Sequence, residues 1–137
     1  MPKSERLAKR NEIGRLFTHG EAFLVYPVKC TYLFRSDGEN EAGNRIMVIV
    51  PKRNHKRAVA RNLLKRRMRE AYRLNKYLLG KGSGHEPMVA DIAFSYIAKG
   101  EPLEYGTIEK AVISILNKLC TIRDNKALQA GGPPVVK

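Results

Sequence analysis

The stretch RIMVIVPKRNHKRAVARNLLKRRMREAYR, residues 45–73, places a strand directly before a helix. Its first six residues, Arg45–Val50, are almost wholly apolar and are followed by Pro51, which is typical of a buried strand. The residues beyond favour a long helix from about Arg57 or Ala58 to Leu79. The pair predicts a helix that packs on a sheet.

Elements of the same two kinds flank this stretch. Ser4–His19 spaces its apolar residues for one helical face, and Gly20 stands where a left-handed C-terminal cap is expected. Pro27 divides the β-branched and aromatic run Ala22–Phe34 into a short strand and a longer one. A further strand and a further helix are expected over Met88–Tyr96 and Leu103–Leu119. The order α-β-β-β-α-β-α predicts an α+β fold with helices packed on a sheet.

The length allows one compact domain with one modest core. Of the 137 residues, residues 1–120 are expected to form that domain. Residues 121–137 contain GGPP and no periodic apolar face, so a flexible C-terminal tail is expected there. Turn-forming or flexible segments are expected at residues 36–44 and 80–84.

The chain is strongly basic. Lys and Arg number 26 against 13 Asp and Glu, a formal net charge of +13, while 43% of the residues are hydrophobic. Such a chain can fold around a core and attract polyanions, nucleic acid first and an anionic membrane surface second. No apolar run approaches the roughly 20 residues that cross a bilayer, and the N-terminus lacks an apolar signal segment. A cytoplasmic protein without a membrane partner is therefore expected.

Most of the positive charge lies in the long helix and just before it, because Lys52–Lys76 holds eleven bases and one acid, Glu70. At about 100° per residue, one arc of the helix gathers Val59, Ala60, Leu63, Leu64, Met68, Ala71, Leu74 and Leu78. The opposite arc gathers Arg61, Asn62, Lys65, Arg66, Arg69, Arg73 and Lys76. An ordinary solvated face mixes charges of both signs, so the helix is expected to pack by the first arc and to offer the second to phosphates.

The chemistry of the helix favours nucleic acid over a membrane. Its apolar residues are needed for the core, and the chain has no Trp for a lipid interface. Asn62 could read a base or a 2′-hydroxyl, or be an ordinary exposed or capping Asn.

No group of residues resembles the active site of an independent enzyme. His19, His55 and His85 are scattered, and none has a partner at metal-ligand spacing. Cys30 and Cys120 form no Cys-x-x-Cys motif and are interpreted as two buried, reduced thiols. Acids at residues 37, 39 and 41 lie in a turn, where solvated carboxylates are common. No catalytic residue is assigned.

The stretch VPKRNHKRAVARNLLKRRMREAYR, residues 50–73, resembles the protein component of bacterial ribonuclease P. The residues that match the family's motif at its own spacing are Ala58, Val59, Arg61, Asn62, Lys65, Arg66, Arg69 and Glu70. The similarity extends more weakly to RLAKRNEIGRLFTHG, residues 6–20. It implies a fold like domain 2 of ribosomal protein S5, with a left-handed β-α-β crossover that departs from the usual right-handed rule.

The resemblance also implies a function. In this family a catalytic RNA, with bound Mg²⁺, removes the 5′ leader of precursor tRNA, and the protein assists. It implies the catalytic RNA and precursor tRNA as partners, one protein per RNA subunit, and no cofactor bound by the protein alone. The basic patch and the resemblance together predict RNA binding by Lys52, Arg53, Arg57, Arg61, Asn62, Lys65, Arg66, Arg69 and Arg73. Phe17 and Ile13 would line a cleft for the single-stranded leader, where stacking on an aromatic ring is indifferent to base sequence.

Three departures from the family pattern stand out. Leu63 occupies the place of a third motif arginine, and Arg67 stands where an apolar residue is common. These two positions lie one turn apart, so we hypothesise that Arg67 supplies the missing guanidinium to the RNA side. Ile13 replaces a family aromatic, and the loop before the basic helix has Lys-Arg where the family often has Gly-Asn and is one residue longer.

Other functions would use the same helix differently. A ribosomal or other structural RNA-binding protein would have no role in cleavage. A DNA-binding helix-turn-helix protein would need a short helix directly before the basic helix, where the sequence predicts a strand. A protein-only nuclease would cleave precursor tRNA without an RNA subunit.

Overall fold

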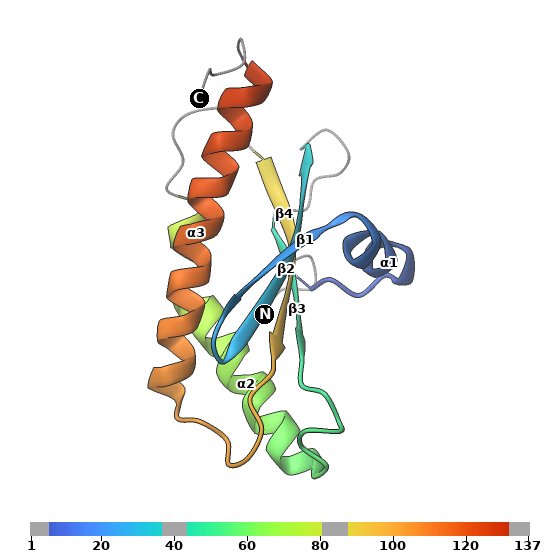
Figure 1. The fold of residues 1–137 in the computed structure, drawn as a ribbon, viewed down its shortest axis with the longest axis vertical. Helices are drawn as coiled ribbons and strands as arrows, with labels where there is room; N and C mark the ends of the chain where they lie inside the picture. The colour runs from blue at the N-terminus through green and yellow to red at the C-terminus, as the bar shows by residue number, and fades with distance from the viewer. Residues whose placement is uncertain (1–5, 37–43, 81–87, 132–137) are drawn as a thin grey trace.

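The computed structural model describes residues 6–36, 44–80 and 88–131 (Figure 1). Its elements are α1 (Arg10–His19), β1 (Glu21–Val25), β2 (Val28–Ser36), β3 (Arg45–Ile49), α2 (Ala58–Asn75), the 3₁₀ helix η3 (Lys76–Gly80), β4 (Met88–Tyr96) and α3 (Tyr105–Gly131). The predicted order of helices and strands is confirmed. The predicted loop acids at residues 37, 39 and 41 lie outside the described residues.

The four strands form one mixed sheet in the order β1-β2-β4-β3. β1 pairs with β2 and β2 with β4 antiparallel, whereas β3 and β4 are parallel neighbours. Pro27 lies in the turn between β1 and β2 and follows a cis peptide bond. Because the chain leaves β3, passes along α2 and returns in β4, the implied β-α-β crossover is present, and its left hand stays a prediction.

Helices pack against both faces of the sheet. α2 and α3 lie on one face and α1 on the other (Figure 1). Side chains alternate along each strand, so Cys30, Ile92 and Phe94 enter the large core beneath α2 and α3. A smaller cluster beneath α1 joins Leu7 and Leu16 to Ala93. One side of α2 is therefore buried against the sheet and α3, and the surface cations lie on its other side and in the loop before it.

The first helix is shorter than predicted. Residues 6–9 are not helical, and Arg6 instead forms an isolated parallel bridge with Ile46 of β3. Gly20 was also wrongly predicted as a left-handed cap, because its φ of −79° and ψ of 171° are extended. Glycine is required at this position for lack of space, because a Cβ on Gly20 would lie 2.4 Å from the Leu16 carbonyl oxygen and 2.6 Å from that of Tyr32.

Gly20→Ala is expected to lower the free energy of unfolding by about 1–3 kcal/mol, because the last turn of α1 and the β2 backbone at Tyr32 must both shift to admit the methyl group. Chemical denaturation measures this change. Gly14→Ala is the matched control, since a Cβ there meets nothing within 4 Å. It should be neutral or stabilising by about 0.5–1 kcal/mol. Equal stability of the two variants would contradict the close approach at Gly20.

The last helix is longer than predicted and continues from Leu119 to Gly131. Ile122 packs on the large core, and Arg123 donates a hydrogen bond to the Leu79 carbonyl, so the turn after Leu119 is held by tertiary contacts. The sequence NKALQA at residues 125–130 also contains strong helix formers. The loose segment predicted to begin at residue 121 is therefore helical as far as residue 131.

The two cysteines are unpaired thiols, as predicted, but only one is buried. Cys30 lies in the large core, and burial raises the pKa of its thiol far above the usual range. Cys120 is half-buried, its Sγ donates to the Leu78 carbonyl at 2.8 Å, and desolvation raises its pKa as well. Separately, the described helices include none that is both long and apolar enough to span a membrane.

Candidate nucleic-acid interface

α2 rests on the sheet and α3 by one face and exposes the other. Its buried residues are Leu64, Met68, Ala71, Tyr72 and Asn75. The exposed positions on the opposite side include Asn62, Arg66, Arg69 and Arg73. The predicted two-faced helix is confirmed in this general form.

The centre of the apolar arc was placed wrongly by roughly 70° around the helix axis. Val59 and Leu74, both expected in the core, are 80% and 47% exposed. Tyr72 is buried instead, with its ring centroid 6.0 Å from that of Phe94. Asn75 is also buried, and its Nδ2 donates to the Ala71 carbonyl at 2.8 Å and to Glu109 Oε2 at 3.0 Å. These bonds satisfy the two N–H donors of the amide, which helps a polar residue to occupy the buried side.

Three cations of α2 have side chains without a hydrogen bond or ion pair to any described residue: Lys65, Arg66 and Arg69. Arg66 and Arg69 are exposed, and Lys65 is half-buried at the edge of the same surface. Arg69 also lines a pocket of about 140 Å³ against β3, together with Arg6 and Val48. Cations that have no acidic partner retain their full charge for an external anion.

The segment between β3 and α2 adds further charge at one end of this surface. Lys52, Arg53 and Arg57 are exposed, as RNA binding requires. A second pocket, of about 490 Å³, is lined by Pro51, Arg53, Asn54, Ile97 and Lys99. Sequence reasoning missed Lys99. The signal that could have found it was the parallel pairing implied by the β-α-β unit. The carboxyl ends of parallel neighbours lie at the same edge of a sheet, so Lys99 after β4 is expected near the residues after β3.

The loop that carries these cations is fixed from two sides. The Arg61 Nη1 donates to the carbonyls of His55 at 2.9 Å and Lys56 at 2.8 Å. The buried His55 ring lies 2.8 Å by its Nε2 from the Ala98 carbonyl, so this nitrogen is the donor. Arg61 thus fixes the loop through its Nη1. His55, for which the sequence suggested no role, attaches the same loop to the residues after β4.

Arg73 is the one predicted RNA-binding residue whose charge is shared within the described structure with an acid. Its Nε and Nη2 donate to Glu70 at 3.0 and 2.6 Å, and these bonds hold the pKa of Glu70 below its usual range. Both side chains are exposed, so the pair contributes little to stability. Its effect is to weaken the positive field at this end of α2.

Arg67 does not join the exposed cations. Its Nη1 donates to the carbonyl of Leu103, just before α3. The guanidinium therefore lies on the α3 side of α2, which does not support the hypothesis that it replaces an arginine missing at Leu63. Instead, it ties α2 to the segment that leads into α3.

Arg67→Ala is expected to lower the free energy of unfolding by about 1–2 kcal/mol, because the Leu103 carbonyl loses a charged donor. The slope of RNA affinity against salt should stay as in the wild type, since this guanidinium contributes no phosphate contact. Filter binding at several salt concentrations measures the slope. A shallower slope would restore the hypothesis that Arg67 contacts RNA.

The two residues proposed for a leader cleft lie on α1, on the opposite face of the sheet from α2 (Figure 1). Phe17 is 49% exposed, whereas Ile13 packs partly buried against the cluster of Leu7, Leu16 and Ala93. Leu24 of β1 is 55% exposed and points to the same side as α1, because its neighbours in β1 pack on the large core. Phe17 is thus available to stack on a base, and Ile13 is largely occupied.

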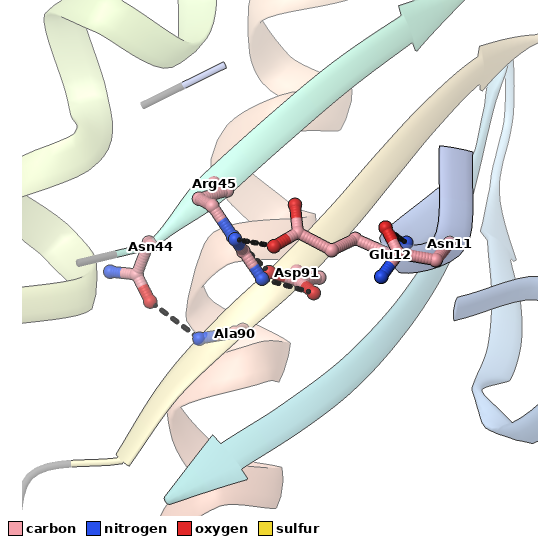
Figure 2. A network of polar contacts seen from close by, with 6 residues as sticks. All are labelled: Asn11, Glu12, Asn44, Arg45, Ala90 and Asp91. Carbon is pink, nitrogen blue, oxygen red and sulfur yellow. Dashed lines mark hydrogen bonds and ion pairs between the residues drawn. The ribbon is translucent and has the colours of Figure 1, made fainter. Parts of the chain in front are cut away.

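A buried ion-pair network joins α1 to the sheet (Figure 2). Arg45 of β3 donates from Nε and Nη2 to both carboxylate oxygens of Asp91 on β4, at 2.9 and 3.0 Å. Its Nη1 reaches Glu12 Oε2 of α1 at 2.6 Å. The sequence offered one signal, an acid in the middle of the mostly apolar strand Met88–Tyr96, because a buried carboxylate needs a partner.

Potential metal ligands do not gather in the described part of the chain. No group of three or more His, Cys, Asp or Glu side chains is placed there to hold an ion. The cations of α2 and of the preceding loop favour anionic groups instead.

Comparison with known proteins identifies the family. A family model described as Ribonuclease P matches residues 1–120. The ribonuclease P protein component of Porphyromonas gingivalis is 38% identical over 129 residues, which cover 94% of this chain and 93% of that protein. The protein of the same description from Ralstonia pickettii is 39% identical over 83 residues, which cover 58% of this chain and 54% of that protein.

Solved structures agree with the fold. The RNase P protein of Thermotoga maritima superposes with a TM-score of 0.63 and 24% identity, covering 83% of this chain and 96% of that one. The RNase P protein of Staphylococcus aureus gives a TM-score of 0.63 and 20% identity, covering 85% and 96%. At these identities the likeness shows the fold alone.

Proposed function

This chain belongs to the ribonuclease P protein family, and from that premise we propose how its surfaces serve the ribonucleoprotein. The family role is that of an RNA-binding subunit in tRNA processing, within an RNA-processing nuclease. We propose that α2 and the preceding loop bind the catalytic RNA. α1 would bind the 5′ leader of precursor tRNA.

The observation that carries the proposal is the set of unpartnered cations on α2. Lys65, Arg66 and Arg69 have no hydrogen bond or ion pair within the described residues, and Asn62 lies exposed among them. Such side chains cost little to bring to phosphates, because no internal bond has to break first. Lys52, Arg53 and Arg57 would extend the contact along the loop. Arg61 would act mainly by holding that loop, and Arg73 would contribute less because it shares Glu70.

We assign hydrolysis to the RNA subunit and Mg²⁺ to the assembled ribonucleoprotein. Two observations support this assignment: the exposed surface of α2 is cationic, and the described residues bring no three potential metal ligands together. The protein would instead neutralise phosphates as the RNA folds around the metal. One protein per RNA subunit is proposed, and sedimentation of the reconstituted particle would measure that ratio.

The leader is proposed to run along the exposed side of α1. Phe17 offers an accessible aromatic face, and stacking on a base is worth about 1–3 kcal/mol regardless of its sequence. Ile13 is less suited, because it is partly buried and lacks a ring. The leader site therefore narrows to Phe17, and Leu24 is a further exposed apolar side chain on the same face of the sheet.

Phe17→Ala is expected to reduce the affinity of the reconstituted particle for precursor tRNA with a long leader by about fivefold or more. Affinity for a substrate with a single leader nucleotide should not change, because it does not reach α1. Equilibrium binding of both substrates measures the difference. Tyr77→Ala removes another exposed aromatic ring, on η3, and serves as the control. Equal losses for both substrates would contradict a leader contact at Phe17.

Two other uses of the basic helix are not favoured. A helix-turn-helix protein would need a helix directly before α2, and β3 with its loop occupies that place. A structural RNA-binding protein would copurify with ribosomal RNA, whereas the proposal predicts recovery of the ribonuclease P RNA.

A further inference from the structure

α1 has little stability of its own. It spans ten residues, and Lys9 at its N-cap makes no side-chain capping bond. Helices shorter than about 12–15 residues are marginal in isolation, and Gly14 weakens this one further. Contacts with the sheet must therefore determine where α1 lies.

Three side chains of α1 make those contacts, and one of them, Ile13, packs partly buried against the small cluster. Leu16 is fully buried in the small cluster with Leu7 and Ala93. Glu12, four residues earlier on the same stripe, has its carboxylate 2.6 Å from Arg45 Nη1. The apolar contacts of Leu16 and Ile13 have no preferred direction, whereas the charged hydrogen bond of Glu12 is directional and so helps to set the orientation of the helix.

Arg45, the partner of Glu12, is fixed to the sheet by its bonds to Asp91. Arg45 is 5% exposed and is held by two hydrogen bonds to the fully buried Asp91, its direct neighbour in the ladder of β3 and β4 (Figure 2). Its third arm is the one that reaches α1. The Arg45 guanidinium is therefore held rigidly on the sheet, and the Glu12 carboxylate is the group of α1 that binds to it.

We propose that Glu12 is a positioning residue for leader binding, acting through Phe17. Phe17 and Ile13 share the next stripe of α1, so the orientation set by Glu12 and Leu16 decides how much of the Phe17 ring faces solvent. This inference rests on the proposed leader site at Phe17. It assigns to Glu12 no contact with RNA and no part in the chemistry.

The test uses the ribonucleoprotein reconstituted with wild type, Glu12→Ala, Glu12→Gln, Phe17→Ala or the double variant Glu12→Ala with Phe17→Ala. Affinity is measured for precursor tRNA with a long leader and with one leader nucleotide, and their ratio is the leader-dependent gain. Glu12→Ala should lose most of this gain, about fivefold or more. Glu12→Gln should lose less, because its amide oxygen can still accept from Arg45. The double variant should lose no more than Phe17→Ala alone.

Two controls separate positioning from charge and from folding. Glu101→Ala removes an exposed carboxylate elsewhere and should leave the gain unchanged. Amide hydrogen exchange of Glu12→Ala should quicken in α1 while β3 and β4 keep wild-type protection, because the Arg45–Asp91 pair remains.

The outcomes are distinguishable. A wild-type gain in Glu12→Ala, with loss in Phe17→Ala, would overturn the inference and leave the leader site standing. No loss in either variant would remove the leader site itself. Additive losses in the double variant would show that Glu12 acts independently of Phe17, which also overturns the inference.

Discussion

Asp91→Ala is expected to lower the free energy of unfolding by about 3–5 kcal/mol, the largest effect of any single substitution considered for this protein. The variant leaves the Arg45 guanidinium buried with two donors unpaired. Domains of this size are stable by only about 5–15 kcal/mol, so much of the total would be lost. Denaturant titration followed by circular dichroism measures the change.

Two comparisons identify the cause of that loss. Glu70→Ala removes a carboxylate with similar bonds to Arg73, but at the surface, and should shift the midpoint only slightly. Arg45→Met added to Asp91→Ala should recover part of the stability, because an apolar side chain needs no partner in that site. If Asp91→Ala were as stable as Glu70→Ala, the network would not hold the sheet and α1 together.

Replacing Arg66 and Arg69 together with alanine is expected to weaken binding to the catalytic RNA by about tenfold or more at moderate salt. The slope of log affinity against log salt concentration should fall by about two, one for each phosphate contact removed. Neither side chain has a hydrogen bond or ion pair within the described residues, so the fold should keep its stability. Filter binding across a salt series gives both quantities.

Lys110→Ala is the control for general charge, because Lys110 is an exposed cation on α3. It should leave the salt slope as in the wild type. The change in salt slope for Arg73→Ala should be larger than for Lys110→Ala and smaller than for the Arg66→Ala, Arg69→Ala variant, since Glu70 already pairs with Arg73. If the salt slope fell as much per charge removed in Lys110→Ala as in the Arg66→Ala, Arg69→Ala variant, the RNA would respond to net charge alone and not to the surface of α2.

The elements of the fold were predictable because they depend on local patterns. The apolar run Arg45–Val50, Pro27 between two strands, and the helical spacing within residues 58–75 each determined an element that the structure confirms. Boundaries that depend on tertiary contacts were not predictable. α1 begins at Arg10 because Arg6 and Leu7 pair with β3, and α3 continues past Leu119 because Ile122 and Arg123 still touch the core and η3.

The site was predictable as a set of basic residues but not in its detail. A helical wheel counted Val59 and Leu74 as core and could not foresee that Tyr72 and Asn75 face inward, because the position of α3 decides which side of α2 is covered. In the same way, spacing cannot show that a guanidinium turns back to a carbonyl, as it does at Arg61 and Arg67. Pairs of residues far apart in sequence, such as Arg45 and Asp91, can be identified only once the three-dimensional fold is known.

The central claim is tested most directly by cleavage of precursor tRNA at physiological Mg²⁺ with the ribonuclease P RNA of Porphyromonas gingivalis, whose protein component is 38% identical to this chain. The account predicts that wild-type protein strongly stimulates release of the intact 5′ leader, and that the Arg66→Ala, Arg69→Ala variant at the same concentration stimulates much less. The protein without RNA should give no cleavage. Absence of stimulation by the wild-type protein, or cleavage by the protein alone, would contradict the account.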